Sequence, residues 1–213
     1  MMQIHRFIFN PFQENTYVLY DDTKEAVIVD AGCSDAEECA ALAGFINKHQ
    51  LKPVVHILTH GHIDHVMGVG FVWEKYGLKP LAHKDVMPFL ESAPEQARMF
   101  GVQTEKLVMP DHFLKEGDQV KFGNSQLEVL HTPGHAAGHL CFVSHINSFV
   151  LSGDVLFRGS IGRTDLPTGD YDLLEKNIRT KIYTLPGEYI VYPGHGPETS
   201  IGIEVKSNPF VMG

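Results

Sequence analysis

The sequence predicts a globular α/β fold: the alternation of elements indicates the α/β class, and the composition and the length indicate a globular protein with a core. Short apolar runs rich in β-branched residues alternate with longer segments in which apolar residues recur at helical spacing. The composition, with 43% hydrophobic and 20% charged residues, is that of a globular protein. A chain of 213 residues can bury a sizeable core. Because no linker or repeat interrupts the pattern, we expect residues 1–213 to form a single domain.

Three short strands are expected first, at residues 4–9, 15–20 and 26–30. The first two flank Asn10-Pro11-Phe12, which is typical turn material, and therefore predict a hairpin. The third strand is closed by Asp30-Ala31-Gly32.

A helix is expected next, at residues 34–49. Ser34 and Glu37 have the spacing of a capping box, and apolar residues recur on one helical face after them. The β-branched run 54–58 then predicts a strand. A strand, a helix and a strand in succession are the opening of an α/β layer.

Two further helices are expected in the middle of the chain, at residues 66–76 and 85–100. The first has apolar residues at helical spacing and Gly77 as its stop signal, and the second contains prolines that shape or break it. A short strand is expected between them, at residues 79–83.

The second half of the chain is richer in predicted strands. Residues 111–122 have the composition of a loop followed by an edge strand. Strands are expected at 126–130, 140–144 and 149–151, each with a His or Asp that could bind a metal ion at or near its end. The last clear helix is expected at 170–185.

The segment Thr59–His65, with the sequence THGHIDH, contains three imidazoles and a carboxylate. Neutral imidazole nitrogens and carboxylate oxygens are ligands of zinc, iron and manganese. His60 and His62 can face one ion from the same side of an extended segment, whereas Asp64 and His65 would face elsewhere and suit a second ion. The alternative is a polar loop that is rich in histidine without binding a metal.

Three later segments favour the metal site, because each places a His or Asp beside a Gly or Pro turn, directly after an apolar run. They are His131-Thr132-Pro133-Gly134-His135, Leu151-Ser152-Gly153-Asp154 and Tyr192-Pro193-Gly194-His195-Gly196. Ligands at the ends of successive strands converge on one edge of a sheet. The sequence therefore predicts that these side chains meet the histidine-rich segment.

This ordered set resembles the metallo-β-lactamase-like hydrolase superfamily, whose pattern is H-x-H-x-D-H followed by H, D and H. The resemblance extends from Asp30-Ala31-Gly32 to His195, which is nearly the whole chain. It implies an αββα four-layer sandwich, in which two mixed β-sheets lie face to face with helices outside.

The same resemblance implies two divalent metal ions, with zinc preferred and iron or manganese as alternatives. It assigns His60, His62 and His135 to the first ion, Asp64, His65 and His195 to the second, and Asp154 to a bridging position between them. The implied nucleophile is a metal-bound hydroxide, because two Lewis-acidic ions lower the pKa of bound water. Asp64 and Asp154 are the catalytic carboxylates in this scheme.

The segment from Phe157 to Asp165, FRGSIGRTD, resembles the glyoxalase II-like branch, the hydroxyacylglutathione hydrolases. This implies a small thioester substrate, whose thiolate, with a pKa near ~8.5, leaves readily. Longer members of that branch continue into a helical domain with basic residues for glutathione. Here 18 residues follow His195, so the chain resembles a short form, and Arg158, Arg163 and Lys206 are the candidates to bind an anionic substrate.

Composition also restricts the partners and the compartment. The formal net charge of −9 argues against nucleic acid, since phosphate binding needs clusters of Lys and Arg. No stretch approaches about 18 consecutive apolar residues, so no membrane span is expected. The N-terminal residues lack the pattern of a signal peptide. The odd number of cysteines, three, argues against a disulfide framework, and we expect a cytoplasmic protein.

Two alternative functions stay open. A persulfide dioxygenase would use the same residues but bind one Fe(II) through His60, His135 and Asp154, a facial triad with positions for O2. A non-catalytic metal-binding module would keep the fold without the reaction. A β-lactamase is disfavoured by the missing export signal. Metal content and oxygen uptake distinguish the hydrolase from the dioxygenase.

Two other histidines have less specific expectations. His56 lies in the middle of a predicted strand and is expected to be a hydrogen-bonded core residue. His139, four residues after His135, either orients a metal ligand or simply packs in the core.

Overall fold

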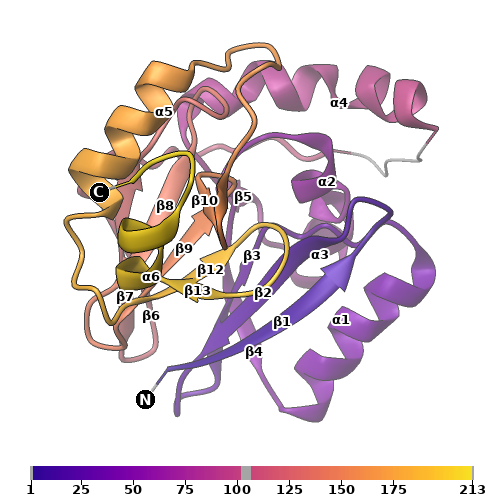
Figure 1. Ribbon diagram of the computed structural model, residues 1–213. Coiled ribbons are helices and arrows are strands. Elements are labelled where there is room, and N and C mark those ends of the chain that lie inside the picture. The colour runs from indigo at the N-terminus through magenta and orange to yellow at the C-terminus, as the bar shows by residue number, and fades with distance from the viewer. Residues whose placement is uncertain (1, 102–106, 213) are drawn as a thin grey trace.

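Two mixed β-sheets lie face to face and helices cover their outer sides, so the predicted αββα arrangement is confirmed (Figure 1). The structure is a computed structural model that describes residues 2–101 and 107–212. Among these residues, no helix has the length and the apolar character needed to cross a membrane.

The first sheet contains the N-terminal strands. Its order is β1 (Gln3–Phe9), β2 (Glu14–Tyr20), β3 (Glu25–Val29), β4 (Lys52–Ile57) and β5 (Pro80–Leu81). The first three strands pair antiparallel, and the last three pair parallel through connections that contain helices. The parallel strands therefore end at the same edge of the sheet.

The second sheet contains strands from the C-terminal half. Its order is β13 (Thr199–Ser200), β12 (Ile190–Pro193), β9 (Phe149–Gly153), β8 (Leu140–Ser144), β7 (Ser125–His131) and β6 (Gln119–Phe122). Only β9 and β12 pair parallel, and the other pairs are antiparallel. A small hairpin of β10 (Leu156–Phe157) and β11 (Ser160–Ile161) follows β9.

Alternation along the strands determines which layer each side chain joins. Leu19 of β2 and Phe142 of β8 belong to the core between the two sheets. The neighbouring Val18 instead packs under the helices outside the first sheet, and Val143 packs under those outside the second sheet. Both faces of each sheet are thus buried, as four layers require.

The helices are α1 (Ala36–Lys48), α2 (Ile63–Val66), α3 (Val69–Tyr76), α4 (Met87–Phe100), α5 (Tyr171–Asn177) and α6 (Ile201–Ser207), with a 3₁₀ turn η1 (Lys84–Val86) before α4 and a π-helical turn η2 (Ile178–Ile182) after α5. Most helices lie on the outside of the two sheets, whereas α2 and α4 pack against each other at one end of the sandwich. Figure 1 shows α1 and α5 on opposite sides of the sandwich.

The helix boundaries differ from prediction at several points. The N-cap of α1 is Asp35 rather than Ser34, because the Asp35 carboxylate accepts the backbone N–H of Glu38. Glu38, not Glu37, is the residue whose carboxylate returns to Ser34. The predicted helix 66–76 is interrupted, since α2 starts earlier at Ile63 and ends before α3 begins.

Other differences lie in the second half. The predicted helix 170–185 changes from α to π geometry after Asn177 and ends at Ile182. The short helix α6 was not predicted. Strand β8 carries no candidate ligand at its carboxyl end, although His139 precedes it.

The prediction for His56 was wrong in one respect. Its side chain is fully buried on β4, but neither ring nitrogen has a hydrogen-bond partner within the described chain. Burial lowers the pKa of His56 to about 3, so the ring is neutral.

Candidate metal centre

The structure brings the seven predicted ligands together at one end of the sandwich. His60, His62, Asp64 and His65 lie in the loop after β4 and in α2, His135 lies in the loop after β7, Asp154 follows β9, and His195 follows β12. Every one of these segments begins where a strand ends. The two sheets therefore contribute ligands to the same edge of the molecule.

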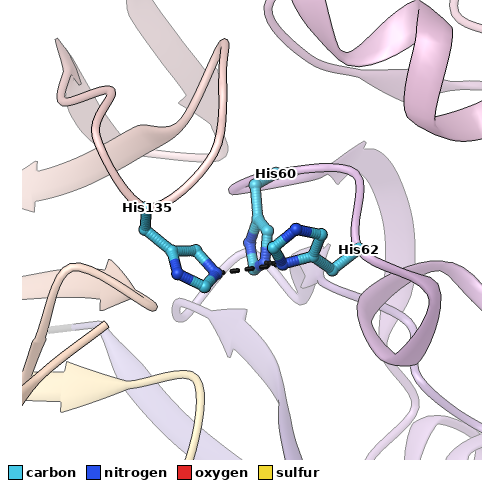
Figure 2. Close-up of side chains that lie close together, drawn as sticks. All are labelled: His60, His62 and His135. Carbon is cyan, nitrogen blue, oxygen red and sulfur yellow. Dashed lines mark hydrogen bonds between the residues drawn. The ribbon is translucent and has the colours of Figure 1, made fainter. Parts of the chain in front are cut away.

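Three imidazoles form the first cluster, shown in Figure 2. His62 Nδ1 lies 3.1 Å from His60 Nε2 and 2.9 Å from His135 Nε2. The other nitrogen of His135, Nδ1, donates to the backbone carbonyl of Arg163 at 2.7 Å. In the neutral ring, Nε2 is then unprotonated and its lone pair is available to a metal ion. Ring nitrogens that face one another in this way fit a cation between them.

Asp64, His65 and His195 form the second cluster. Asp64 Oδ2 lies 3.0 Å from His195 Nε2 and 3.6 Å from His65 Nε2. Each histidine is held by its other nitrogen: His65 Nδ1 donates to Asp30 Oδ2 at 3.1 Å, and His195 Nδ1 donates to the carbonyl of Phe12 at 3.1 Å. Both Nε2 atoms are thereby directed into the cluster.

Asp154 lies between the two clusters. Its Oδ1 is 3.5 Å from His65 Nε2, and its Oδ2 is 3.6 Å from both His135 Nε2 and His195 Nε2. Within the described residues, Asp154 Oδ1 and His65 Nε2 are buried and have no hydrogen-bond partner. Buried polar atoms without partners are costly, and a metal ion would satisfy both. The donor set therefore fits metal binding.

The ionisation of the first cluster suits metal ligands. Burial lowers the pKa of His60 well below its usual value, and the neighbouring histidines add to the shift. Burial and then the charge of His135 lower the pKa of His62 to about 4. Burial also lowers the pKa of His135. All three imidazoles are neutral near pH 7, as metal ligands must be.

The second cluster has the opposite tendency. Burial alone would lower the pKa of His65, but the carboxylates of Asp64 and Asp154 raise it well above its usual value. Burial alone would raise the pKa of Asp154, but His65, His135 and His195 lower it far below its usual range. This cluster is therefore rich in negative charge that a cation would balance.

Behind the ligands lie residues to which sequence reasoning assigned no role. The Asp30 carboxylate accepts the backbone N–H of Thr59 at 2.7 Å and the Thr59 hydroxyl at 2.6 Å, besides the His65 ring. Glu14 is fully buried, with Oε1 3.8 Å from His65 Nδ1, and burial raises its pKa well above the usual value. The only sequence signal for them is a polar residue at a strand end.

His139 acts on the site through the backbone. Its Nε2 accepts the backbone N–H of Asp154 at 3.1 Å, and its ring stacks on His60 with the ring centres 4.9 Å apart. Of the two roles considered for His139, these contacts favour the orientation of metal ligands.

The clusters open into a pocket of about 440 Å³. Its walls include Phe12, Phe157 and Leu166, and Arg163 is the one predicted substrate-binding residue among its lining residues. The Arg163 side chain is paired with both oxygens of Asp165 at 2.7 Å. Arg158 and Lys206 are exposed and lie outside the lining of this pocket.

An αββα fold with His and Asp clusters at one sheet edge defines a class of metal-dependent hydrolases. The comparison with known families agrees, since residues 9–195 match the model of the metallo-beta-lactamase superfamily. The chain belongs to this superfamily. Its members bind divalent metals at His and Asp clusters of the kind described here.

Three relatives cover nearly the whole chain. Hydroxyacylglutathione hydrolase GloC of Haemophilus influenzae is 40% identical over 212 residues, which are 99% of this chain and 98% of that protein. The crystal structure of BLEG-1 B3 metallo-beta-lactamase has a TM-score of 0.89 and 38% identity, covering 99% of this chain and 100% of that one. TTHA1623 in a di-iron-bound form has a TM-score of 0.88 and 37% identity, covering 97% and 100%.

Proposed function

We propose that this chain is a dinuclear metal-dependent hydrolase that cleaves a small thioester, in the manner of a hydroxyacylglutathione hydrolase. The observation that carries the proposal is the position of Asp154, whose two carboxylate oxygens face histidines of both clusters. A closed structural site for a single ion needs no carboxylate in such a position.

In this proposal the two clusters each hold one ion. His60, His62 and His135 would hold the first, Asp64, His65 and His195 would hold the second, and Asp154 would be shared between them. When bound, two divalent ions would supply Lewis acidity, which lowers the pKa of water and polarises a carbonyl. We expect zinc, with iron or manganese as alternatives, and the di-iron form of TTHA1623 supports iron as a serious alternative.

The residues of the chain orient the ligands and the reacting water. Asp64 and Asp154 line the pocket, where a carboxylate can accept a hydrogen bond from a water molecule and fix its direction. Backbone carbonyls at Phe12 and Arg163 hold the rings of His195 and His135, so the geometry does not depend on mobile side chains.

Two arguments support a thioester as the substrate. The first is the likeness to the Haemophilus influenzae hydroxyacylglutathione hydrolase over the full length of both chains. The second is chemical, because a thiolate with a pKa near ~8.5 leaves without a protonated side chain to assist it. We further propose one domain, since both sheets contribute ligands to the same site, and a cytoplasmic protein without a nucleic-acid partner.

The test is metal content by elemental analysis on protein purified without added metal, measured together with hydrolysis of S-lactoylglutathione. About two metals per chain and thioester cleavage are expected. His62→Ala should lower both, whereas the matched control His112→Ala, an exposed histidine far from the clusters in sequence, should change neither.

Other results would replace the proposal. One iron per chain, no cleavage, and oxygen consumption with glutathione persulfide would indicate a dioxygenase with His60, His135 and Asp154 as ligands. Two metals with cleavage of a β-lactam but not of a thioester would indicate the activity named for BLEG-1.

A further inference from the structure

A second and larger cavity lies beside the metal pocket. Its volume is about 840 Å³, and it shares His62, Gln96, Phe100 and Leu166 with the pocket over the clusters. The two cavities therefore form one continuous groove that leads away from the proposed reaction centre.

The walls of this second cavity are mostly apolar. Met87, Pro88, Phe89 and Met99 of α4 form one side, and Pro167 lies in the segment on the other side. Water at such surfaces is displaced favourably by an apolar group. The shape and chemistry of the cavity thus favour a hydrocarbon chain.

The apolar wall is tied to the metal site by Phe89. Its ring packs edge-to-face on His62, with the ring centres 5.4 Å apart. A side chain at Gly61 would approach Phe89 Cβ to 2.7 Å, so the glycine permits this close packing. The near end of the cavity is therefore positioned directly beside a candidate metal ligand.

Two polar side chains of the cavity, Ser92 and Gln96, form hydrogen bonds within α4. Gln96 Nε2 donates to Ser92 Oγ at 2.8 Å, and Ser92 Oγ donates to the carbonyl of Phe89 at 3.1 Å. Asp85 lies 3.4 Å from His83 Nδ1, and Lys84 is exposed at the rim of the cavity. The hydrogen bonds of Ser92 and Gln96 are thus made within α4, and the apolar side chains make up most of the remaining wall.

We propose that the groove formed by α4 and Leu166–Thr168 binds an apolar acyl chain of the substrate and makes the enzyme selective for medium-chain acyl thioesters. This inference rests on the proposed thioester hydrolysis and specifies its substrate class. We assign the acyl part of the thioester to the apolar groove because the thiol parts of thioesters, such as coenzyme A, are polar.

The first experiment measures binding of the carboxylic acid product to the metal-loaded protein by calorimetry. Full burial of a methylene strengthens binding about fourfold, and a groove open on one side should give about twofold for each methylene. Octanoate should therefore bind about 60-fold more tightly than acetate. Equal affinities for the two acids would overturn the proposal whatever the enzyme hydrolyses.

The second experiment places a charge in the groove. Met87→Glu is suited to this because Met87 is the first residue of α4, where the helix dipole tolerates an acidic side chain. The variant should lower the ratio of octanoyl to acetyl glutathione hydrolysis, as kcat/KM, by at least about 10-fold. Ile203→Glu, at an exposed apolar residue of α6, is the matched control and should leave the ratio unchanged.

The two hypotheses fail in different ways. Hydrolysis of S-acetylglutathione and S-octanoylglutathione at equal kcat/KM would overturn the groove proposal and leave thioester hydrolysis intact. No hydrolysis of either ester, with octanoate still bound far more tightly than acetate, would overturn the reaction and support the groove as an apolar site. An equal loss of the ratio in Met87→Glu and Ile203→Glu would also overturn the groove proposal.

Discussion

Asp30→Asn is expected to weaken metal binding although Asp30 belongs to neither ligand cluster that we propose to hold an ion. One carboxylate oxygen of Asp30 accepts the backbone N–H of Thr59, and the other accepts from the Thr59 hydroxyl and from His65 Nδ1. An amide in place of the carboxylate has only one acceptor oxygen. Its NH2 group must then face either the N–H of Thr59 or the N–H of His65.

The magnitude follows from the tautomer of His65. If the amide oxygen keeps the rigid backbone N–H of Thr59, the amide nitrogen faces His65 Nδ1 and favours the tautomer in which Nδ1 accepts. The proton then moves to Nε2, the atom that faces Asp64 and Asp154. Loss of such an orienting partner typically lowers metal affinity 10- to 100-fold. Asn tolerates the positive φ of 48° at this position, so the backbone conformation is preserved.

The assay is metal affinity by competition with a chromophoric chelator, with circular dichroism to verify folding. Asp21→Asn is the matched control, because Asp21 is another buried aspartate that accepts several hydrogen bonds but lies outside the metal clusters. A folded Asp30→Asn protein whose metal affinity stays within about twofold of the unmodified protein would refute this reasoning about the tautomer.

Three further predictions concern the carboxylate of Asp154, the packing of Gly194 against it, and Asp21, which follows β2 of the first sheet and accepts hydrogen bonds from Asn124 and Ser125 at the start of β7 in the second sheet. Asp154→Ala should abolish thioester hydrolysis and lower metal content, because it removes a group that faces both clusters; retention of both ions in elemental analysis would contradict the bridging role. Gly194→Ala should also lower metal content without unfolding the protein, since the added Cβ would overlap Asp154 Oδ1. Burial alone would raise the pKa of Asp21, but hydrogen bonds from Thr23, Ser125 and Asn124 lower it to about 2. The ionised Asp21 carboxylate therefore contributes about 2 kcal/mol to the free energy of unfolding. This contribution is complete above the unfolded pKa of about 4 and is lost as the pH falls toward 2. Denaturant titrations of native and Asp21→Asn protein at pH 6 and pH 2.5 would measure it.

The sequence was most informative where a pattern has a local physical cause. Strands β1 to β4 follow from β-branched runs between turns, and Gly77 ends α3 in the left-handed conformation as predicted. The break between α2 and α3 was missed because apolar residues continue at helical spacing through it. The cap of α1 was misassigned by one residue because Ser34 and Asp35 are both good caps. In the structure Asp35 caps the helix, while the Glu38 carboxylate binds Ser34 and the backbone N–H of Asn10, a tertiary contact.

The ligand loops were predictable because each follows an apolar strand, so a linear pattern indicated one end of the fold. The supporting residues were not predictable in the same way. Glu14 at the start of β2 and Asp30 directly after β3 act on His65 from positions far away in sequence. Arg158 and Arg163 have similar sequence contexts, yet only Arg163 lines the pocket. Direction of a side chain at a loop depends on tertiary packing, which local sequence does not specify.

The charge of the buried site favours two ions over one. Four carboxyl groups, those of Glu14, Asp30, Asp64 and Asp154, surround His65. Burial raises the pKa of Glu14 well above its usual value, which favours its uncharged form and leaves the carboxylates of Asp64 and Asp154 as the negative charge of the second cluster. Without a cation, the site can offset them only by keeping protons on histidines, in agreement with the raised pKa of His65 and His195. A single divalent ion in the first cluster would leave this second cluster uncompensated. A second ion there would take the place of those protons, and the unpartnered His65 Nε2 and Asp154 Oδ1 would become its ligands.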